Sequence, residues 1–224
     1  MEIRSNAVKW VSAMPNDQLV DYLPQLLQAL KHDTYEASPM ARFLLCRSLE
    51  SPRVAHFLYW HLVHNLPGDS PQNTNETTQV EVDESLITQA RYHRRNKMML
   101  RALLAMCGEK LSARFLAQNM MCKSLADVAQ HVKSAKESMR QKTLVQGLES
   151  VNQILLERPT SLPLGPGLEV TGVNVRNCSY FNSNTLPLKI NFLCPDGGLL
   201  PAIFKVKTFT FIFKHIEINI KFIF

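Results

Sequence analysis

A run of small polar residues between two expected strands has residue types suited to binding an anion. It reads CSYFNSNTLPLKINF, residues 178–192, and the later segment AIFKVK places Lys205 inside another expected strand. A turn of Asn and Ser offers backbone N–H groups and hydroxyls to a phosphate. A lysine in the next strand can contact the same anion. Phosphate binding is therefore a hypothesis here, set against the ordinary alternative of a solvated turn and a solvated strand lysine.

Other reactive side chains have simpler interpretations. His61 and His64 in the segment HFLYWHLVH share one helix face, where two histidines could bind a metal. No carboxylate or cysteine is placed to complete the ligand set, so we expect ordinary histidines on a polar face. The pairs Met98-Met99 and Met120-Met121 could line a ligand groove, but methionine commonly fills gaps in helical cores. We therefore assign them to the core.

Motif content and charge restrict the function further. The sequence contains no nucleophile elbow, no H-E-x-x-H helix and no G-x-x-x-x-G-K-[ST] loop. Its five cysteines include no C-x-x-C pair, which indicates a reducing compartment without a zinc or redox site. The net charge of +6 favours acidic surfaces such as anionic lipid. The densest basic run, residues 91–97, lacks aromatics at base-stacking spacing, so we expect a solvated helix face and no nucleic-acid partner.

Helical periodicity dominates residues 6–156. Ser38-Pro39 and Ser51-Pro52 each combine an N-cap hydroxyl with a proline at the first helical position. Apolar stripes after these starts predict short antiparallel helices that stack into an α-solenoid. Residues 67–85 predict a flexible polar loop, and a single long helix is expected over residues 125–155.

The C-terminal third has a different character. Three prolines and two glycines in RPTSLPLGPG, residues 158–167, predict a domain boundary. Short segments rich in β-branched and aromatic residues follow at 170–178, 186–193 and 202–206, and the turn PDGG separates the last two. These features predict a small, incomplete antiparallel sheet. The first residues carry no secretory signal and no apolar run is long enough to span a membrane, so we expect a cytoplasmic chain.

Two long stretches resemble one known family. NAVKW together with DYLPQLLQALKHDTYEASPMARFLLCRSLESPRVAHFLYWHLV is similar to the helical accessory domain of phosphoinositide 3-kinases. CSYFNSNTLPLKINF resembles the phosphate-facing hairpin of their kinase domain in class II members, the gamma type most of all. The resemblance implies a mainly α chain: an armadillo-like helical accessory (PIK) domain at 1–157, a linker at 158–169, a partial kinase N-lobe at 170–207 and an aberrant tail at 208–224.

The resemblance also implies site residues and a substrate class. Asn182, Ser183 and Asn184 correspond to the loop over the ATP phosphates, Lys205 to the phosphate-binding lysine, and Ile203 to an adenine contact. A complete member would use ATP and Mg to phosphorylate phosphatidylinositol or its 4-phosphate, associating peripherally with the membrane surface. Protein partners of the helical domain are also expected.

The family motifs D-x-R-Q-D, D-R-H-N-x-N and D-F-G are absent from this sequence. We therefore expect a truncated chain that does not catalyse alone, because metal-binding carboxylates and a positioned base are needed for phosphoryl transfer. The alternatives are a non-catalytic helical scaffold or interaction module, or a non-functional gene-model fragment. Alternation of Phe and Ile in the tail, at residues 209–220, predicts an extra strand or an aggregating segment.

Overall fold

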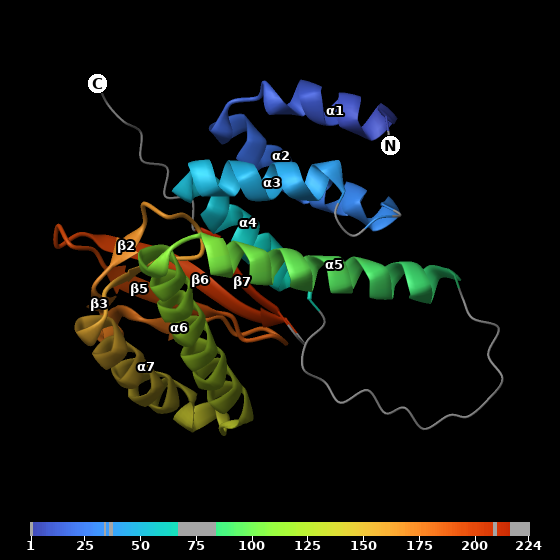
Figure 1. The fold of residues 1–224 in the computed structure, drawn as a ribbon. Coiled ribbons are helices and arrows are strands. Elements are labelled where there is room, and N and C mark those ends of the chain that lie inside the picture. The colour runs from blue at the N-terminus through green and yellow to red at the C-terminus, as the bar shows by residue number, and fades with distance from the viewer. Residues whose placement is uncertain (1, 34, 36–37, 67–83, 208–209, 216–224) are drawn as a thin grey trace, which may run out of the picture. The chain divides into compact units, whose positions relative to one another are not determined.

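The computed structural model describes residues 2–33, 35, 38–66, 84–207 and 210–215 (Figure 1). It divides into two compact units, Met1–Ser112 and Ala113–Phe224. The expected loop at 67–85 lies outside the described residues except for its last two positions. Among the described residues, no helix is both long and apolar enough to cross a bilayer.

Helices make up the first unit, and two of them begin where the Ser-Pro pairs predict. The Ser38 hydroxyl accepts a hydrogen bond from the Ala41 N–H at 3.1 Å. The Ser51 hydroxyl accepts one from the Val54 N–H at 3.4 Å. Each cap satisfies an N–H that the helix itself leaves without a partner. The elements are α1 (Glu2–Ser12), α2 (Asn16–Ala29), η1 (Leu30–His32), α3 (Pro39–Glu50), α4 (Pro52–His64) and α5 (Glu84–Met106).

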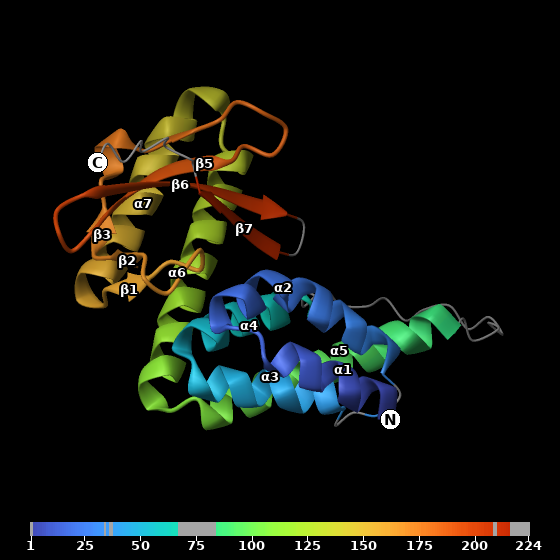
Figure 2. The ribbon, with the colours of Figure 1, turned by 90° about the horizontal axis from the view of Figure 1, so that it is seen from above.

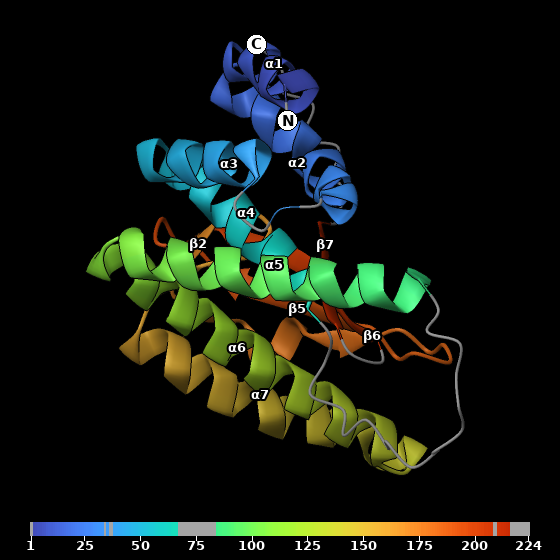
Figure 3. The same cartoon turned by 45° about the vertical axis from the view of Figure 1, so that its right-hand side comes forward.

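These helices stack in a repeating way. α1 packs against α3, α2 against α4, and α3 against α5, so each helix meets the one two places further along the chain. Figure 1 shows α1, α3 and α5 one below another, and Figure 3 shows α4 between α3 and α5. The core between them is largely leucine, fully buried at positions 19, 23, 27, 30, 44, 58, 62 and 103. This stacking of helix pairs confirms the expected mainly α, solenoid-like architecture.

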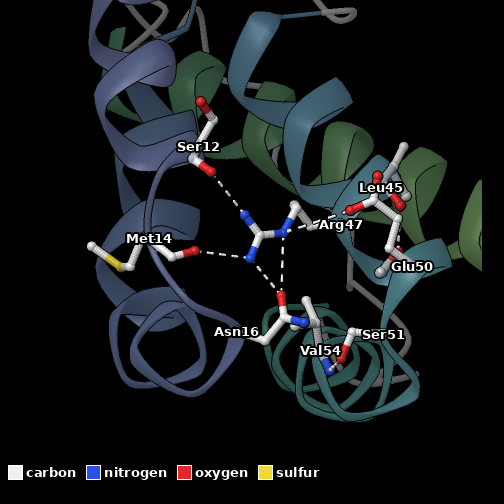
Figure 4. A network of polar contacts seen from close by, with 9 residues as sticks. Ser12, Met14, Asn16, Leu45, Arg47, Glu50, Ser51 and Val54 are labelled. Atoms are coloured by element: carbon white, nitrogen blue, oxygen red, sulfur yellow. Dashed lines mark hydrogen bonds and ion pairs between the residues drawn. The ribbon is translucent and has the colours of Figure 1, made fainter.

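Two arginines form hydrogen bonds to the segments that connect these helices. The Arg47 guanidinium on α3 donates to the carbonyls of Ser12 at 3.1 Å and Met14 at 2.9 Å, and to Oδ1 of Asn16 (Figure 4). Arg95 on α5 donates to the carbonyls of Leu30, Asp33 at 2.8 Å and Tyr35 at 3.0 Å. Helix ends leave carbonyls without intrahelical partners, and these side chains supply donors for them.

The second unit begins in the first turns of a long helix, and here the expected helix over 125–155 is wrong. The chain forms α6 (Glu109–Ser134), a short turn with η2 (Glu137–Met139), and α7 (Arg140–Glu157). Residues 133–138, KSAKES, are mostly polar and contain neither Gly nor Pro, so the usual markers of a helix end are missing. The buried residues of α7 recur every three or four positions, at 144, 148, 151 and 155.

An antiparallel sheet follows the helices of the second unit. Its strands are β3 (Gly172–Val173), β4 (Ser179–Tyr180), β5 (Leu188–Leu193), β6 (Leu199–Lys207) and β7 (Thr210–His215), with η3 (Val175–Asn177) after β3; β1 (Thr160–Ser161) and β2 (Glu169–Val170) form a separate pair. The order is β3-β5-β6-β7, and β4 also pairs with β5. The β5–β6 turn closes as predicted, through the Gly197 N–H and the Cys194 carbonyl at 3.0 Å, with Gly197 at φ 81°. α7 packs against β3, and Figure 2 shows it behind β5 and β6.

Part of the expected tail pairs with the sheet. β7 lies antiparallel to β6, with Lys205 opposite Ile212 and Phe204 opposite Phe213. β6 therefore has a neighbour on each side. Residues 208–209 and 216–224 lie outside the described residues. The domain limits expected at 157, 158–169 and 170–207 stay predictions; the compact units themselves divide between residues 112 and 113.

Candidate functional site

The loop that carries the three expected phosphate-binding residues joins β4 to β5. It is closed by the Phe181 N–H donating to the Pro187 carbonyl at 2.9 Å, and by the Leu186 N–H donating to the Ser183 carbonyl at 3.0 Å. Asn182, Ser183 and Asn184 are exposed at its tip. These bonds hold the ends of the loop while leaving the polar side chains accessible to a ligand.

One residue of this loop has an unusual backbone. Leu186 has φ 41°, in the left-handed region, while its side chain is 6% exposed. A non-glycine residue takes this conformation only where its surroundings compensate for the strain. Burial of the leucine side chain supplies that compensation. The buried side chain of Leu186, two residues before β5, therefore anchors the loop.

The strand register brings Lys205 to the loop end of the sheet. Leu188, the first residue of β5, lies opposite Phe204 of β6. Continuing that antiparallel register places Lys205 level with Pro187, which closes the loop. Ile203 lies one residue to the other side of Phe204 and opposite Lys189. The expected site residues therefore gather at one end of the sheet, Lys205 beside the loop and Ile203 further in.

Alternation along the strands decides which side of the sheet these residues face. Leu188, Ile190, Ala202 and Phe204 are fully buried, whereas their neighbours Lys189, Ile203 and Lys205 are only half-buried. Successive strand residues point to opposite faces. One face therefore forms the core of the unit, and Ile203 and Lys205 lie together on the other face.

Lys189 was not among the residues expected from the sequence. It lies directly opposite Ile203 and diagonally from Lys205, on the same face. Diagonal neighbours in an antiparallel pair have Cβ atoms about 7–8 Å apart, within reach of two long side chains converging on one anion. In the strand LKINFL, Lys189 alternates with the buried residues Leu188 and Ile190, and this alternation is the sequence signal that could have identified it.

The next feature is the pair of histidines, His61 and His64, on α4. No group of three or more His, Cys, Asp and Glu side chains placed to bind a metal occurs among the described residues. The Nδ1 atom of His64 lies 2.7 Å from the Trp60 carbonyl. Burial, and secondarily the charge of His64, lower the pKa of His61.

Met99 and Met121 belong to the core as expected, but Met98 and Met120 are exposed, so the core assignment is wrong for those two.

The expected solvated basic face on residues 91–97 holds only in part. Arg91, Arg94 and Lys97 are exposed, but Arg95 is 2% exposed and binds the carbonyls after η1. Because an α-helix turns once every 3.6 residues, these positions lie on different sides of α5, and the basic run is divided between the surface and the core.

Comparison with known proteins identifies the helical part. Residues 1–113 match the family described as phosphoinositide 3-kinase family, accessory domain (PIK domain). The match ends one residue beyond the first compact unit. It covers half of the chain.

The relatives extend the similarity through both units. The chain is 39% identical over 207 residues to the human phosphatidylinositol 4-phosphate 3-kinase C2 domain-containing subunit beta, covering 91% of this chain and 11% of that protein. It is 35% identical to the human phosphatidylinositol 3-kinase C2 domain-containing subunit gamma, covering 91% and 12%. The alpha subunit of Pongo abelii is 32% identical, covering 92% and 11%.

These identities do not favour the expected gamma type over the beta type. The chain spans about a tenth of the length of these relatives. All three are C2 domain-containing subunits, the class II type expected from the sequence. From the matched accessory domain and these relatives together, the chain belongs to the phosphoinositide 3-kinase family.

Proposed function

We propose that this chain supplies a phosphoinositide 3-kinase with its helical accessory domain and with the hairpin that holds the phosphates of ATP. The observation that most directly supports the second role is the β5–β6 register. It brings the polar β4–β5 loop and Lys205 to the same end of the sheet. Loop amides and a neighbouring lysine together form a typical phosphate-binding arrangement.

Each residue has a distinct role in this proposal. The Lys205 ammonium binds the phosphate oxygens, and the loop at Asn182, Ser183 and Asn184 covers them from the end of the sheet. Ile203 offers an apolar surface to the adenine. Lys189, on the same face, contributes a second positive charge. ATP supplies the phosphoryl group when it is bound, and the residues of this chain bind and orient its phosphates.

Magnesium does not fit the described residues as well as the nucleotide does. Mg²⁺ is bound by carboxylate oxygens, and the described part of the chain has no cluster of carboxylates suited to a metal. We therefore assign no metal-dependent step to these residues. Transfer to phosphatidylinositol or its 4-phosphate, and a cytoplasmic location with peripheral attachment to the membrane, are proposed for the whole kinase.

Nucleotide titration of the purified chain tests the hairpin. Binding of ATP and of adenosine is measured by calorimetry for the wild type, Lys205→Met and Lys142→Met. Lys142 is an exposed lysine on α7 and serves as a matched control for charge. Loss of a hydrogen bond from a charged donor costs about 1.5–3 kcal/mol, so Lys205→Met is expected to weaken ATP binding about 10- to 100-fold.

The pattern across ligands separates a phosphate site from a general loss of structure. Adenosine binding is expected to be unchanged in Lys205→Met, because adenosine carries no phosphate. Equal weakening by Lys142→Met, or no weakening by Lys205→Met, would reject the assignment of Lys205. A wild-type chain that folds but binds no ATP would reject the hairpin role and leave the non-catalytic helical scaffold. That alternative has support in the separate leucine core of the first unit.

A further inference from the structure

A strip of positive charge follows the outer side of α5. Arg91, Arg94, Lys97 and Arg101 are all exposed. Their spacing of three, three and four residues keeps them on one side of the helix, and from Arg91 to Arg101 they extend about 15 Å at 1.5 Å per residue. We call these four residues the basic stripe.

The opposite side of α5 is fully occupied by the core of the first unit. Tyr92, Asn96, Met99 and Leu103 are buried there, where α5 packs against α3 and α4. A helix of this composition, alone in solution, could insert its apolar side into the groove of a partner. Here that side is already covered, so only the charged side is available. A broad charged surface suits this side better than a groove.

The composition of α5 itself is strongly basic. α5 carries one acidic residue, Glu84, seven positions before the stripe begins. Apolar side chains lie among and beside the cations instead: Ile87 is 37% exposed and Met98 is 45% exposed. Cations mixed with exposed apolar side chains match a lipid interface, where the cations meet anionic headgroups and the apolar groups enter the region below them.

We propose that the basic stripe of α5 is a docking surface for an anionic lipid bilayer. Nucleic acid fits less well, because the stripe has no exposed aromatic side chain on which a base could stack. The proposal rests on the charge and exposure of α5 and does not depend on the nucleotide hairpin. It would place the helical unit against the membrane independently of any headgroup-specific pocket.

Vesicle sedimentation of the purified full chain tests the stripe. Binding is compared between vesicles of pure phosphatidylcholine and vesicles that also contain phosphatidylserine. The double variant Arg91→Glu/Arg101→Glu is compared with Lys133→Glu/Lys136→Glu, which makes the same charge change at two exposed lysines near the end of α6. Circular dichroism and thermal unfolding confirm that both variants fold.

The magnitude follows from the number of cations removed. Each cation near an anionic surface changes partitioning about fivefold, so the stripe variant is expected to lose at least about 25-fold in affinity for the anionic vesicles. The α6 control is expected to lose much less. Wild-type binding is expected to weaken as salt rises and to be negligible on pure phosphatidylcholine.

Several outcomes would overturn the proposal. One is equal loss in the two double variants, because overall charge would then explain binding without the stripe. Another is tighter binding to phosphatidylinositol 4-phosphate than to phosphatidylserine at equal surface charge, which points to a headgroup pocket. A third is loss of single-stranded RNA binding in the stripe variant with vesicle binding retained. Failure to bind ATP in the separate titration would leave this result untouched.

Discussion

Replacing Arg47 tests whether the arginine contacts in Figure 4 stabilise the first unit. The Arg47 side chain is 14% exposed and binds three acceptors on the segment between α1 and α2. Arg47→Met keeps much of the apolar stem but removes every donor. The Met14 carbonyl and Asn16 Oδ1 are partly buried and lose a charged donor, whereas the Ser12 carbonyl is exposed and can bind water.

The two partly buried acceptors decide the magnitude. A hydrogen bond to a charged group contributes about 1.5–3 kcal/mol, and we expect the low end for each of these two acceptors because they are only partly buried. We therefore expect Arg47→Met to lower the free energy of unfolding of the first unit by about 2–4 kcal/mol. With a urea m-value of about 2 kcal/mol/M, the midpoint falls by about 1–2 M.

Tryptophan fluorescence makes this measurement specific to the first unit. Both tryptophans of the chain, Trp10 and Trp60, lie within it, and Trp60 is buried while Trp10 is largely exposed. Urea unfolding followed at Trp60 in a Trp10→Phe background reports the core of this unit. Because this signal reports only the first unit, the analysis of unfolding does not require the whole two-unit chain to unfold in a single two-state transition.

Arg53→Met is the matched control. Arg53 is an arginine of the same unit whose side chain is 50% exposed and pairs with Asp17 at 2.9 Å. Exposed ion pairs contribute about 0–1 kcal/mol, so this variant should change the midpoint little. If Arg47→Met and Arg53→Met shift the midpoint equally, the Arg47 contacts are not what stabilises the unit.

Three further results are expected. Ser38→Ala removes an N-cap and should destabilise the first unit by about 1 kcal/mol; an unchanged urea midpoint would show that the cap is dispensable. Because burial and His64 lower the pKa of His61 in the folded chain, the protonated form is favoured on unfolding. Stability should therefore be complete above the unfolded value of 6.5 and fall as the pH drops below it, with a smaller fall in His61→Gln; equal pH profiles would contradict this. Burial also raises the pKa of the Cys122 thiol, so iodoacetamide should modify exposed Cys46 in the native chain and Cys122 only after unfolding. Equal labelling rates by mass spectrometry would be inconsistent with that burial.

Local chemistry explains which elements were predictable. The starts of α3 and α4 depend on a serine hydroxyl and the following proline, so each can be identified from two adjacent residues. The β5–β6 turn depends on Gly197, whose φ of 81° few other residues adopt. The break between α6 and α7 carries no such marker, because residues 133–138 contain neither Gly nor Pro, so the sequence predicts a continuous helix there.

Contacts between distant residues were the part that could not be predicted. Arg95 stands in a run of basic residues, and its acceptors lie 60–65 positions earlier in the chain. Lys189 joins the candidate site only because the register sets it opposite Ile203. Propensity and spacing describe neighbours along the chain, whereas these roles arise when separate segments meet.

The two arginine contacts also bear on how the helical unit forms during synthesis. Arg47 closes the connection between α1 and α2 from 31–35 residues downstream, and Arg95 closes the segment after η1 from 60–65 residues downstream. A ribosome adds residues from the N-terminus, so the early helices emerge before either guanidinium exists. Helices α1 to α4 are therefore synthesised before α5, and the Arg95 contacts that close the segment after η1 can form only once α5 has emerged.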